Sequence, residues 1–249
     1  MANYWNVVNK VIDKADILLL VLDSRFVDQT RNEELEQKIL LAGKKLIYVM
    51  TKCDLVEKDY IEKIKNKLRP SVFVSSKEFL GTTMLKEKII REGYLQGIKE
   101  RIKVGVLGYP NVGKSSLINA MKGRKAAPTS ITSGQTRGVQ NINAGSKIVF
   151  LDTPGVIPYS EKDKNKHALT GSVDFAKTKE PDMAVMSIME QCPGKIERYY
   201  NVEVSEDKEQ TLEQIALKKK VILKAGEPDT KRMAVVILKE WQTGKIKTD

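Results

Sequence analysis

The chain has 249 residues, of which 41% are hydrophobic and 30% charged, which leaves room for one α/β domain and a smaller second one. It contains no apolar run long enough to span a bilayer and no basic stretch followed by an apolar run at its start, so we expect neither a membrane span nor a secretory signal. The two cysteines, Cys53 and Cys192, lie far apart in sequence and form no metal-binding pair, which indicates a reduced, cytoplasmic setting.

The formal net charge of +11 is concentrated in one segment. Residues 101–159 hold eight basic side chains and one acidic side chain, whereas residues 1–100 and 160–249 are close to balance. Such an excess predicts a polyanionic partner such as RNA, and a solvated basic face is the alternative. The cations that give the segment its excess, besides Lys114, are Arg101, Lys103, Lys122, Arg124, Lys125, Arg137 and Lys147.

Strand and helix signals alternate over the first 155 residues. Short apolar runs bounded by turn residues predict strands at Asp16–Asp23, Lys45–Thr51, Ser71–Ser75, Lys103–Leu107, Val139–Ala144 and Lys147–Leu151. Apolar residues at helical spacing predict helices at Asn32–Ala42, Lys58–Leu68, Thr83–Ile98 and Gly113–Met121. This alternation predicts a mostly parallel sheet with helices on both faces.

After about residue 160 the patterns are helical only, at Asp182–Gln191, Glu206–Lys224 and Thr230–Gln242. Trp241 lies on an apolar face, so a buried anchor is favoured over an RNA-stacking residue, and we expect the same of Trp5. The lysine run 218–220 either contacts RNA phosphates or is a solvated helix end. We predict an α/β domain over residues 1–165 and a small helical, RNA-contacting domain over residues 166–249.

A glycine-rich loop lies between an expected strand and an expected helix. Its glycines let backbone N–H groups cradle a β-phosphate, Lys114 reaches the β- and γ-phosphate oxygens, and the Ser115 hydroxyl holds Mg²⁺. Asp152-Thr153-Pro154-Gly155 directly follows a buried strand; Asp152 would orient Mg²⁺ through water, and the Gly155 N–H would sense the γ-phosphate. The two motifs together predict a Mg²⁺-dependent nucleotide site. The loop residues expected to bind the phosphates are Gly108, Tyr109, Pro110, Asn111, Val112, Gly113, Lys114, Ser115 and Ser116.

Thr51-Lys52-Cys53-Asp54 follows another buried strand and predicts a guanine-reading loop. The Asp54 carboxylate accepts hydrogen bonds from the guanine N1–H and exocyclic amine, whereas adenine would leave it unpaired. Lys52 would cover the base and ribose, and Thr51 stands where asparagine is commoner, which weakens the expected tie to the phosphate loop. Ser75-Ser76-Lys77 would supply a backbone N–H to the guanine O6; an ordinary strand-to-loop turn is the alternative.

Thr136 stands at the spacing at which a switch threonine closes over Mg²⁺ and the γ-phosphate. Thr132 is its competitor, and an ordinary loop threonine is the alternative. We therefore expect Lys114, Thr136 and Gly155 to serve catalysis, and Ser115, Thr136 and Asp152 to hold Mg²⁺.

The base-reading motif precedes the phosphate loop, an order that resembles the circularly permuted GTPases of the YlqF/YawG group, which assist assembly of the large ribosomal subunit. Asp23-Ser24-Arg25 with Arg31-Asn32 looks like the family's D-A-R…R-N stretch, and residues 228–246 resemble its C-terminal helical domain. The resemblance implies a Ras-like P-loop sheet, GTP or GDP with Mg²⁺, and large-subunit rRNA, mature or precursor, as partner. It also implies that a γ-phosphate-dependent shift of Asp152–Gly155 would move the helical domain.

Turnover is expected to be slow. Val156 and Ile157 stand where Ras-like enzymes carry a water-positioning glutamine, and the resemblance implies weak hydrolysis until the ribosome completes the site. The histidine that bacterial relatives carry near the N-terminus is absent, and we expect His167 to be a polar linker residue rather than a catalyst. Asn111 stands where potassium-stimulated GTPases ligate K⁺; an asparagine that stabilises a turn is the alternative.

The leading hypothesis is a monomeric GTPase that binds large-subunit rRNA in its GTP state and leaves after hydrolysis. The alternative is a nucleotide-gated RNA-binding scaffold with negligible turnover. A GTPase of tRNA modification or of a membrane would need a modification domain or a hydrophobic anchor, and the sequence has neither pattern.

Overall fold

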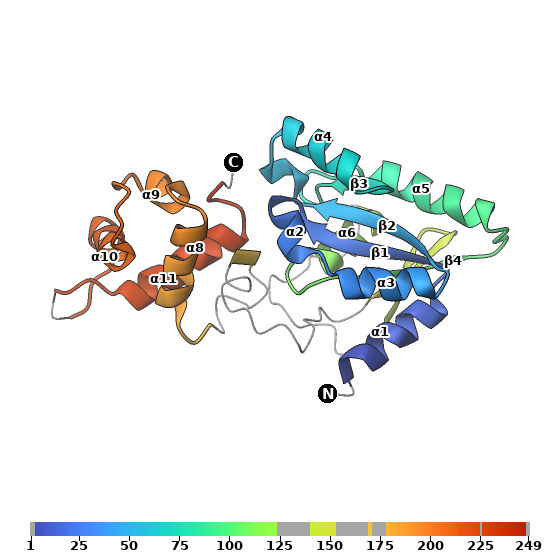
Figure 1. The fold of residues 1–249 in the computed structure, drawn as a ribbon, viewed down its shortest axis with the longest axis horizontal. Helices are drawn as coiled ribbons and strands as arrows, with labels where there is room; N and C mark the ends of the chain where they lie inside the picture. Colours follow the sequence, from blue (N-terminus) through green and yellow to red (C-terminus); the bar gives the residue numbers. More distant parts are fainter. Residues whose placement is uncertain (1–2, 124–139, 153–168, 171–177, 225, 248–249) are drawn as a thin grey trace. The chain divides into compact units, whose positions relative to one another are not determined.

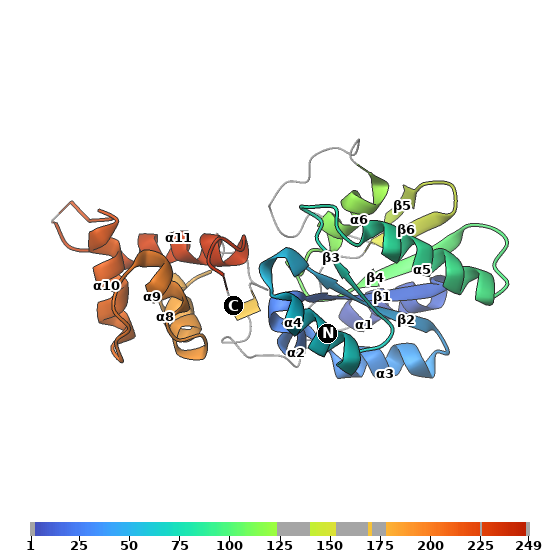
Figure 2. The ribbon, with the colours of Figure 1, turned by 90° about the horizontal axis from the view of Figure 1, so that it is seen from above.

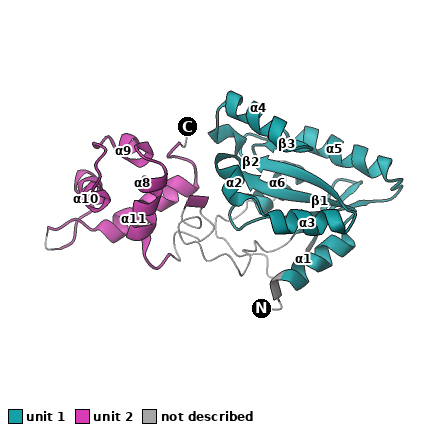
Figure 3. Cartoon of the chain, in the orientation of Figure 1, with its two compact units in different colours: residues 1–161 teal, residues 162–249 magenta. Residues whose placement is uncertain are grey.

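The computed structural model describes residues 3–123, 140–152, 169–170, 178–224 and 226–247. The chain divides into two compact units, residues 1–161 and 162–249 (Figure 3). The domain boundary predicted between residues 165 and 166 lies outside the described residues and stays a prediction. No helix in the described part is both long and apolar enough to cross a bilayer.

Six described strands of the first unit form one sheet in the order β3-β2-β1-β4-β6-β5 (Figures 1 and 2). The earliest strand of the chain, β1, lies inside the sheet, parallel to both of its neighbours, and among the six only β5, at the edge, is antiparallel. The predicted α/β class with a mostly parallel sheet is thereby confirmed. The strands are β1 (Ile17–Asp23), β2 (Lys45–Thr51), β3 (Ser71–Val74), β4 (Ile102–Leu107), β5 (Gln140–Ala144) and β6 (Ile148–Asp152).

Alternate side chains of β1 point to opposite faces of the sheet, and both sets are fully buried. Ile17, Leu19 and Val21 belong to a core shared with α5 (Thr82–Leu95) and α6 (Lys114–Lys122). The intervening leucines belong to a core shared with α1 (Asn3–Lys14), α3 (Glu33–Leu41) and α4 (Lys58–Lys67). Burial on both faces is why the strand is an unbroken apolar run.

Among the helices whose bounds the structure describes, α1, α2 (Val27–Thr30) and α9 (Lys195–Tyr200) were not expected. In α1 the side chains of Val8, Val11 and Ile12 pack against the sheet, but asparagines at every third position from Asn3 dilute the apolar pattern. Asparagine also has low helix propensity, so packing rather than local preference stabilises this helix.

The second unit is helical in its described part, with α8 (Pro181–Gln191), α9, α10 (Lys208–Lys218) and α11 (Thr230–Gln242). Trp241 is fully buried and its Nε1 donates to the Leu169 carbonyl at 2.9 Å, which confirms its reading as an anchor. The helix expected over Glu206–Lys224 ends at Lys218. Lys220 adopts a left-handed conformation at φ 55°, which an α-helix cannot continue through.

Candidate nucleotide-binding site

The motif residues gather at one edge of the sheet, because parallel strands end at the same edge. Asp23 ends β1, Thr51 ends β2 and Asp152 ends β6. Ser75 follows β3, and Gly108 follows β4. The structure thus brings together the base-reading and phosphate motifs, which are distant in sequence.

The phosphate loop passes directly over the backbone of β1. Gly108 has φ 147°, and a Cβ there would lie 2.4 Å from the Val21 carbonyl oxygen. Gly113, at φ 103°, is the N-cap of α6. As a glycine it has no side chain that could occupy the N–H groups at the start of the helix. A helix N-terminus without a side-chain cap leaves N–H groups that can bind an anion.

Lys114 is buried, and its Nζ donates to the carbonyls of Gly108 at 2.9 Å and Tyr109 at 2.6 Å. Burial lowers the pKa of Lys114 to about 8, and the nearby negative charge of Asp152 opposes this shift. The ammonium group therefore already lies within the loop, electrostatically coupled to the buried carboxylate at the end of β6.

These residues fit a nucleoside triphosphate with Mg²⁺. The cradle at Gly108 has no room for a side chain, and a buried lysine and a buried carboxylate lie beside it. Ser115 lies exposed in the first turn of α6. The described residues contain no group of three or more histidine, cysteine or acidic side chains that could hold a metal. Mg²⁺ does not need one, since it binds through one or two protein oxygens together with substrate phosphates.

Thr51 links the base-reading loop to the phosphate loop. Its Oγ1 contacts the Val112 carbonyl oxygen in a short hydrogen bond, and it also lies 3.0 Å from the Leu22 carbonyl oxygen at the end of β1. The tie that we expected threonine to weaken is thus present, and it runs through the hydroxyl to the loop backbone.

Lys52 and Asp54 present different environments to a base. Lys52 has a left-handed backbone at φ 56°, and its Nζ lies 2.8 Å from Asp23 Oδ2. Burial lowers the pKa of Lys52, against the charge of Asp23, which raises it. The Asp54 side chain is exposed at the loop surface, where it can accept hydrogen bonds from a ligand.

Asp23 anchors this half of the site and was not expected to do so. It is fully buried, and Arg25 approaches it with Nε at 3.0 Å from Oδ1 and Nη2 at 2.7 Å from Oδ2. Burial alone would raise the pKa of Asp23, but the charges and hydrogen bonds of Lys52 and Arg25 hold it well below its ordinary value. The available signal was a carboxylate that ends a wholly apolar strand, with an arginine two residues later.

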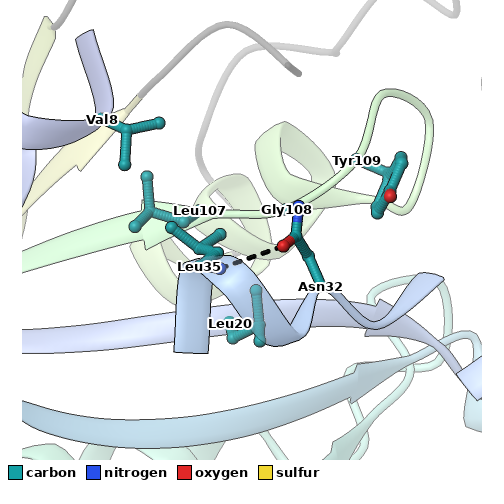
Figure 4. Close-up of a pocket in the computed structure, with 7 residues that line it drawn as sticks. All are labelled: Val8, Leu20, Asn32, Leu35, Leu107, Gly108 and Tyr109. Carbon is teal, nitrogen blue, oxygen red and sulfur yellow. Dashed lines mark hydrogen bonds between the residues drawn. The ribbon is translucent and has the colours of Figure 1, made fainter. Parts of the chain in front are cut away.

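Arg31 and Asn32, the second part of the stretch that resembles the family, act on α3. The Asn32 side chain caps this helix by accepting from the Leu35 N–H at 2.9 Å. Arg31 pairs with Glu36 through two hydrogen bonds of 2.7 Å. Figure 4 shows Asn32 beside Gly108, where both line a small pocket that also includes Tyr109. The stretch therefore fixes the start of α3 next to the phosphate loop.

The Ser75 loop is a firmly held turn. The buried Ser75 hydroxyl accepts from the Glu78 N–H at 3.1 Å, and the Ser75 N–H donates to the Leu80 carbonyl at 3.1 Å. The buried Ser76 hydroxyl has no hydrogen-bond partner within the described residues, and Lys77 is exposed. Whether this turn reads guanine O6 stays a prediction.

Several expected residues lie outside the described part of the chain: Thr132, Thr136, Gly155, Val156, Ile157 and His167. Their roles stay predictions, and so does the motif Asp152–Gly155 beyond its first residue.

A family model described as "50S ribosome-binding GTPase" matches residues 103–227, half of the chain. The match begins in β4, immediately before the phosphate loop. The base-reading loop lies ahead of it, as a permuted order requires.

Curated relatives match nearly the whole chain. An uncharacterized GTP-binding protein of Methanocaldococcus jannaschii is 42% identical over 245 residues, which cover 96% of this chain and 65% of the relative. Nucleolar GTP-binding protein 2 of Yarrowia lipolytica is 34% identical, with 97% of this chain and 49% of the relative covered. The same protein of Saccharomyces cerevisiae is 33% identical, with coverage of 97% and 52%. The chain thus spans about half the length of these fungal relatives.

Among solved structures, YlqF from T. maritima in its GNP-bound form matches with a TM-score of 0.69 and 20% identity. The match covers 98% of this chain and 95% of that chain, and the GDP-bound form matches with a TM-score of 0.68. These likenesses establish the fold, including the permuted order of its sheet. The chain therefore belongs to the 50S ribosome-binding GTPase family and has the circularly permuted fold of YlqF.

Proposed function

We propose that the protein binds GTP with Mg²⁺, hydrolyses it to GDP and phosphate, and acts in the cytoplasm as a monomeric switch in large ribosomal subunit assembly. The observation that carries the nucleotide part is the Thr51 hydroxyl, which joins the base-reading loop to the phosphate loop at one edge of the sheet. The ribosomal part is supported by the family and by the names of the nucleolar relatives. In this proposal the protein binds rRNA in its GTP state.

Each half of the site takes one part of the nucleotide. Asp54 accepts hydrogen bonds from the guanine edge, while Lys52, held by Asp23, covers the base. Lys114 exchanges its carbonyl partners in the loop for phosphate oxygens. Ser115 and Asp152, with Thr136, hold the Mg²⁺, which when bound neutralises phosphate charge.

Hydrolysis is proposed to be slow in the isolated protein, because Val156 follows Gly155 where a glutamine would position water. In this proposal the ribosomal subunit completes the site. Asn111, at φ 58° in the phosphate loop, is the proposed ligand of a stimulating K⁺ ion. Subunit-stimulated turnover in KCl should then exceed that in NaCl, and equal rates would remove the potassium part.

Base specificity tests the nucleotide part. Asp54→Asn should weaken GTP binding by about 10- to 100-fold, because hydrogen bonds to a charged acceptor contribute about 1.5–3 kcal/mol. The same variant should gain affinity for xanthosine triphosphate, whose 2-carbonyl accepts from the new amide. Fluorescent-nucleotide titrations measure both affinities. A control variant, Asp59→Asn in α4, should change neither, and unchanged GTP affinity in Asp54→Asn would refute the base-reading role.

Co-sedimentation with large ribosomal subunits tests the ribosomal part. The protein is spun with subunits in the presence of a non-hydrolysable GTP analogue, GDP or no nucleotide, while phosphate release from GTP is followed in parallel. Retention with the analogue only, together with faster hydrolysis, supports a ribosome-triggered switch. Retention without stimulated turnover would favour the nucleotide-gated scaffold. Absence from the subunit fraction in every state would overturn the assembly role.

A further inference from the structure

A cleft lies in the first unit, away from the nucleotide site. Its volume is about 760 Å³, and it opens on one face of the β4–β6–β5 part of the sheet. Lys103, Val149 and Asn143 are direct neighbours across these strands, so they share that face. Their sequence neighbours Ile102, Ile148 and Ala144 point into the core on the opposite face. The residues that line the cleft are Lys99, Glu100, Arg101, Lys103, Asn141, Asn143, Ser146, Lys147, Val149 and Leu151.

The lining is strongly basic. It carries four cations, Lys99, Arg101, Lys103 and Lys147, against the single carboxylate of Glu100. All four side chains are exposed, and none of the ion pairs in the described part of the chain involves them. Arg101 instead donates to the Asn143 side-chain oxygen at 3.1 Å, and Lys147 to the Lys99 carbonyl at 3.4 Å. Their positive charge is therefore available to a ligand.

The cations lie at the opposite edge of the sheet from the phosphate loop. Lys99 and Arg101 precede β4, Lys103 is near its start, and Lys147 immediately precedes β6. The phosphate loop and Asp152 lie at the other ends of the same strands. Strands of five to six residues are about 17–20 Å long, so a ligand of the cleft need not touch the nucleotide.

The uncharged polar side chains that line the cleft indicate which class of polyanion it can bind. Two asparagine amides and one serine hydroxyl, which both donate and accept hydrogen bonds, stand among the cations. None of the described residues that line the cleft is aromatic, so the stacking contacts typical of base recognition are not among those it offers. Cations recognise phosphates without regard to sequence, and groups that donate and accept suit ribose 2′-hydroxyls.

We propose that this cleft binds the sugar–phosphate backbone of RNA. The inference rests on the proposed rRNA binding. It names a surface for that binding on the GTPase unit itself, formed in part by cations of the basic segment 101–159, in addition to the RNA contact predicted for the helical unit. Each phosphate contact releases condensed counterions, so its loss leaves a measurable trace in the salt dependence of binding.

The test compares two triple variants in binding to isolated large-subunit rRNA between 50 and 200 mM KCl. The first is Arg101→Gln/Lys103→Gln/Lys147→Gln. The matched control, Lys58→Gln/Lys63→Gln/Lys88→Gln, removes as much charge from α4 and α5, where these lysines also form no ion pair within the described residues. Three lost phosphate contacts should lower the slope of log affinity against log salt by about 2. Affinity at low salt should fall at least tenfold, and the control should stay near wild type.

Nucleotide affinity, measured with a fluorescent GDP, should be the same in both variants and reports that each is folded. If wild type and both variants bind rRNA equally, the cleft proposal is overturned while the proposed function stands. If wild type itself binds no rRNA, both fall. If polyglutamate competes with rRNA and loses affinity for the cleft variant to the same extent, the site is a general polyanion surface and its assignment to RNA is wrong.

Discussion

The base-binding half and the phosphate-binding half of the nucleotide site are held in shape by different interactions. On the base side, charged side chains are held by one another: Asp23 is buried between Lys52 and Arg25 at distances of 2.7–3.0 Å. On the phosphate side, the shape is set by the backbone, with Gly108 and Gly113 at positive φ. The base side is therefore fixed by ion pairs, of which Asp23–Lys52 is long-range in sequence, and the phosphate side by local chain geometry.

This difference predicts which substitutions each half of the site tolerates. An ion cluster around a buried carboxylate depends on every member, because a removed partner leaves an uncompensated buried charge. A backbone cradle tolerates changes of side-chain chemistry nearby but not an added Cβ. The two halves should therefore fail in different assays.

The largest effect is expected from Asp23→Asn, which leaves Lys52 and Arg25 without their carboxylate. Breaking a buried pair costs about 3–5 kcal/mol, measured as the free energy of urea unfolding. The matched substitution Asp28→Asn removes an exposed pair with Lys67 and should cost less than about 1 kcal/mol. Equal losses in the two variants would mean that the base side is not held by its ions.

The stability of the protein at acid pH also depends on the ion pairs of Asp23. The pKa of Asp23 is depressed in the folded state, so its contribution is present above the ordinary carboxyl pKa of about 4 and is lost as pH falls below it. Asp23→Asn should accordingly lose less stability than wild type over that acid range.

Gly108→Ala is expected to damage the phosphate side. Its Cβ would lie 2.4 Å from the Val21 carbonyl oxygen, and the backbone at φ 147° is strained for alanine. We expect a cost of about 2–3 kcal/mol in stability and a loss of nucleotide binding. Gly123→Ala, at φ 98° with open space around its Cβ, isolates the strain alone. If that control lost as much nucleotide affinity, close approach to β1 would not be the reason.

The pH dependence of nucleotide binding is expected to follow Lys114. Its pKa of about 8 means that it is charged below pH 8 and increasingly neutral above, whereas a phosphate ligand needs it charged. Affinity for GDP should be level from pH 6.5 to 7.5 and about tenfold weaker at pH 9. Lys114→Met should bind weakly with no such decline, and a wild-type profile that stays flat to pH 9 would contradict the lowered pKa.

The smallest effect is expected from loss of the Thr51 hydroxyl, which links the base-reading loop to the phosphate loop. Thr51→Val keeps the shape of the side chain but removes the hydroxyl that reaches the Val112 and Leu22 carbonyls. One lost hydrogen bond costs about 1 kcal/mol, or roughly a fivefold loss of GTP affinity. Thr51→Ser retains the hydroxyl and should recover most of it. A valine variant with full affinity would show that the halves are aligned without this bond.

Much of the fold follows from local pattern. The strand over Lys45–Thr51 was predicted to the residue, because buried parallel strands are continuous apolar runs with clear ends. The helix α1 was missed because packing against the sheet, and not its own sequence, stabilises it. The helix α10 ended earlier than expected, at Lys218, because Lys220 has a left-handed conformation that the apolar pattern of the sequence does not reveal.

The site was predictable in part. The sequence pattern placed Thr51 at the end of one strand and Gly108 directly after another, and both strands proved to end at the same edge of the sheet. The pairing of Asp23 with Lys52 joins residues 29 positions apart, and no local pattern encodes such a contact. The hydroxyl tie from Thr51 to Val112 spans 61 positions and required the assembled sheet.

The position of β1 inside the sheet has a consequence for biosynthesis. A ribosome makes a chain from its N-terminus, so β1, β2 and β3, with Asp23 and Lys52, emerge well before the phosphate loop. During that interval GTP has no phosphate cradle to bind and cannot assist folding. The ion cluster of Asp23, Arg25 and Lys52 lies wholly within this early part of the chain, so its contacts do not depend on the nucleotide. The sheet that carries the nucleotide site is complete only once β6 has emerged, so the nucleotide can join only after that point.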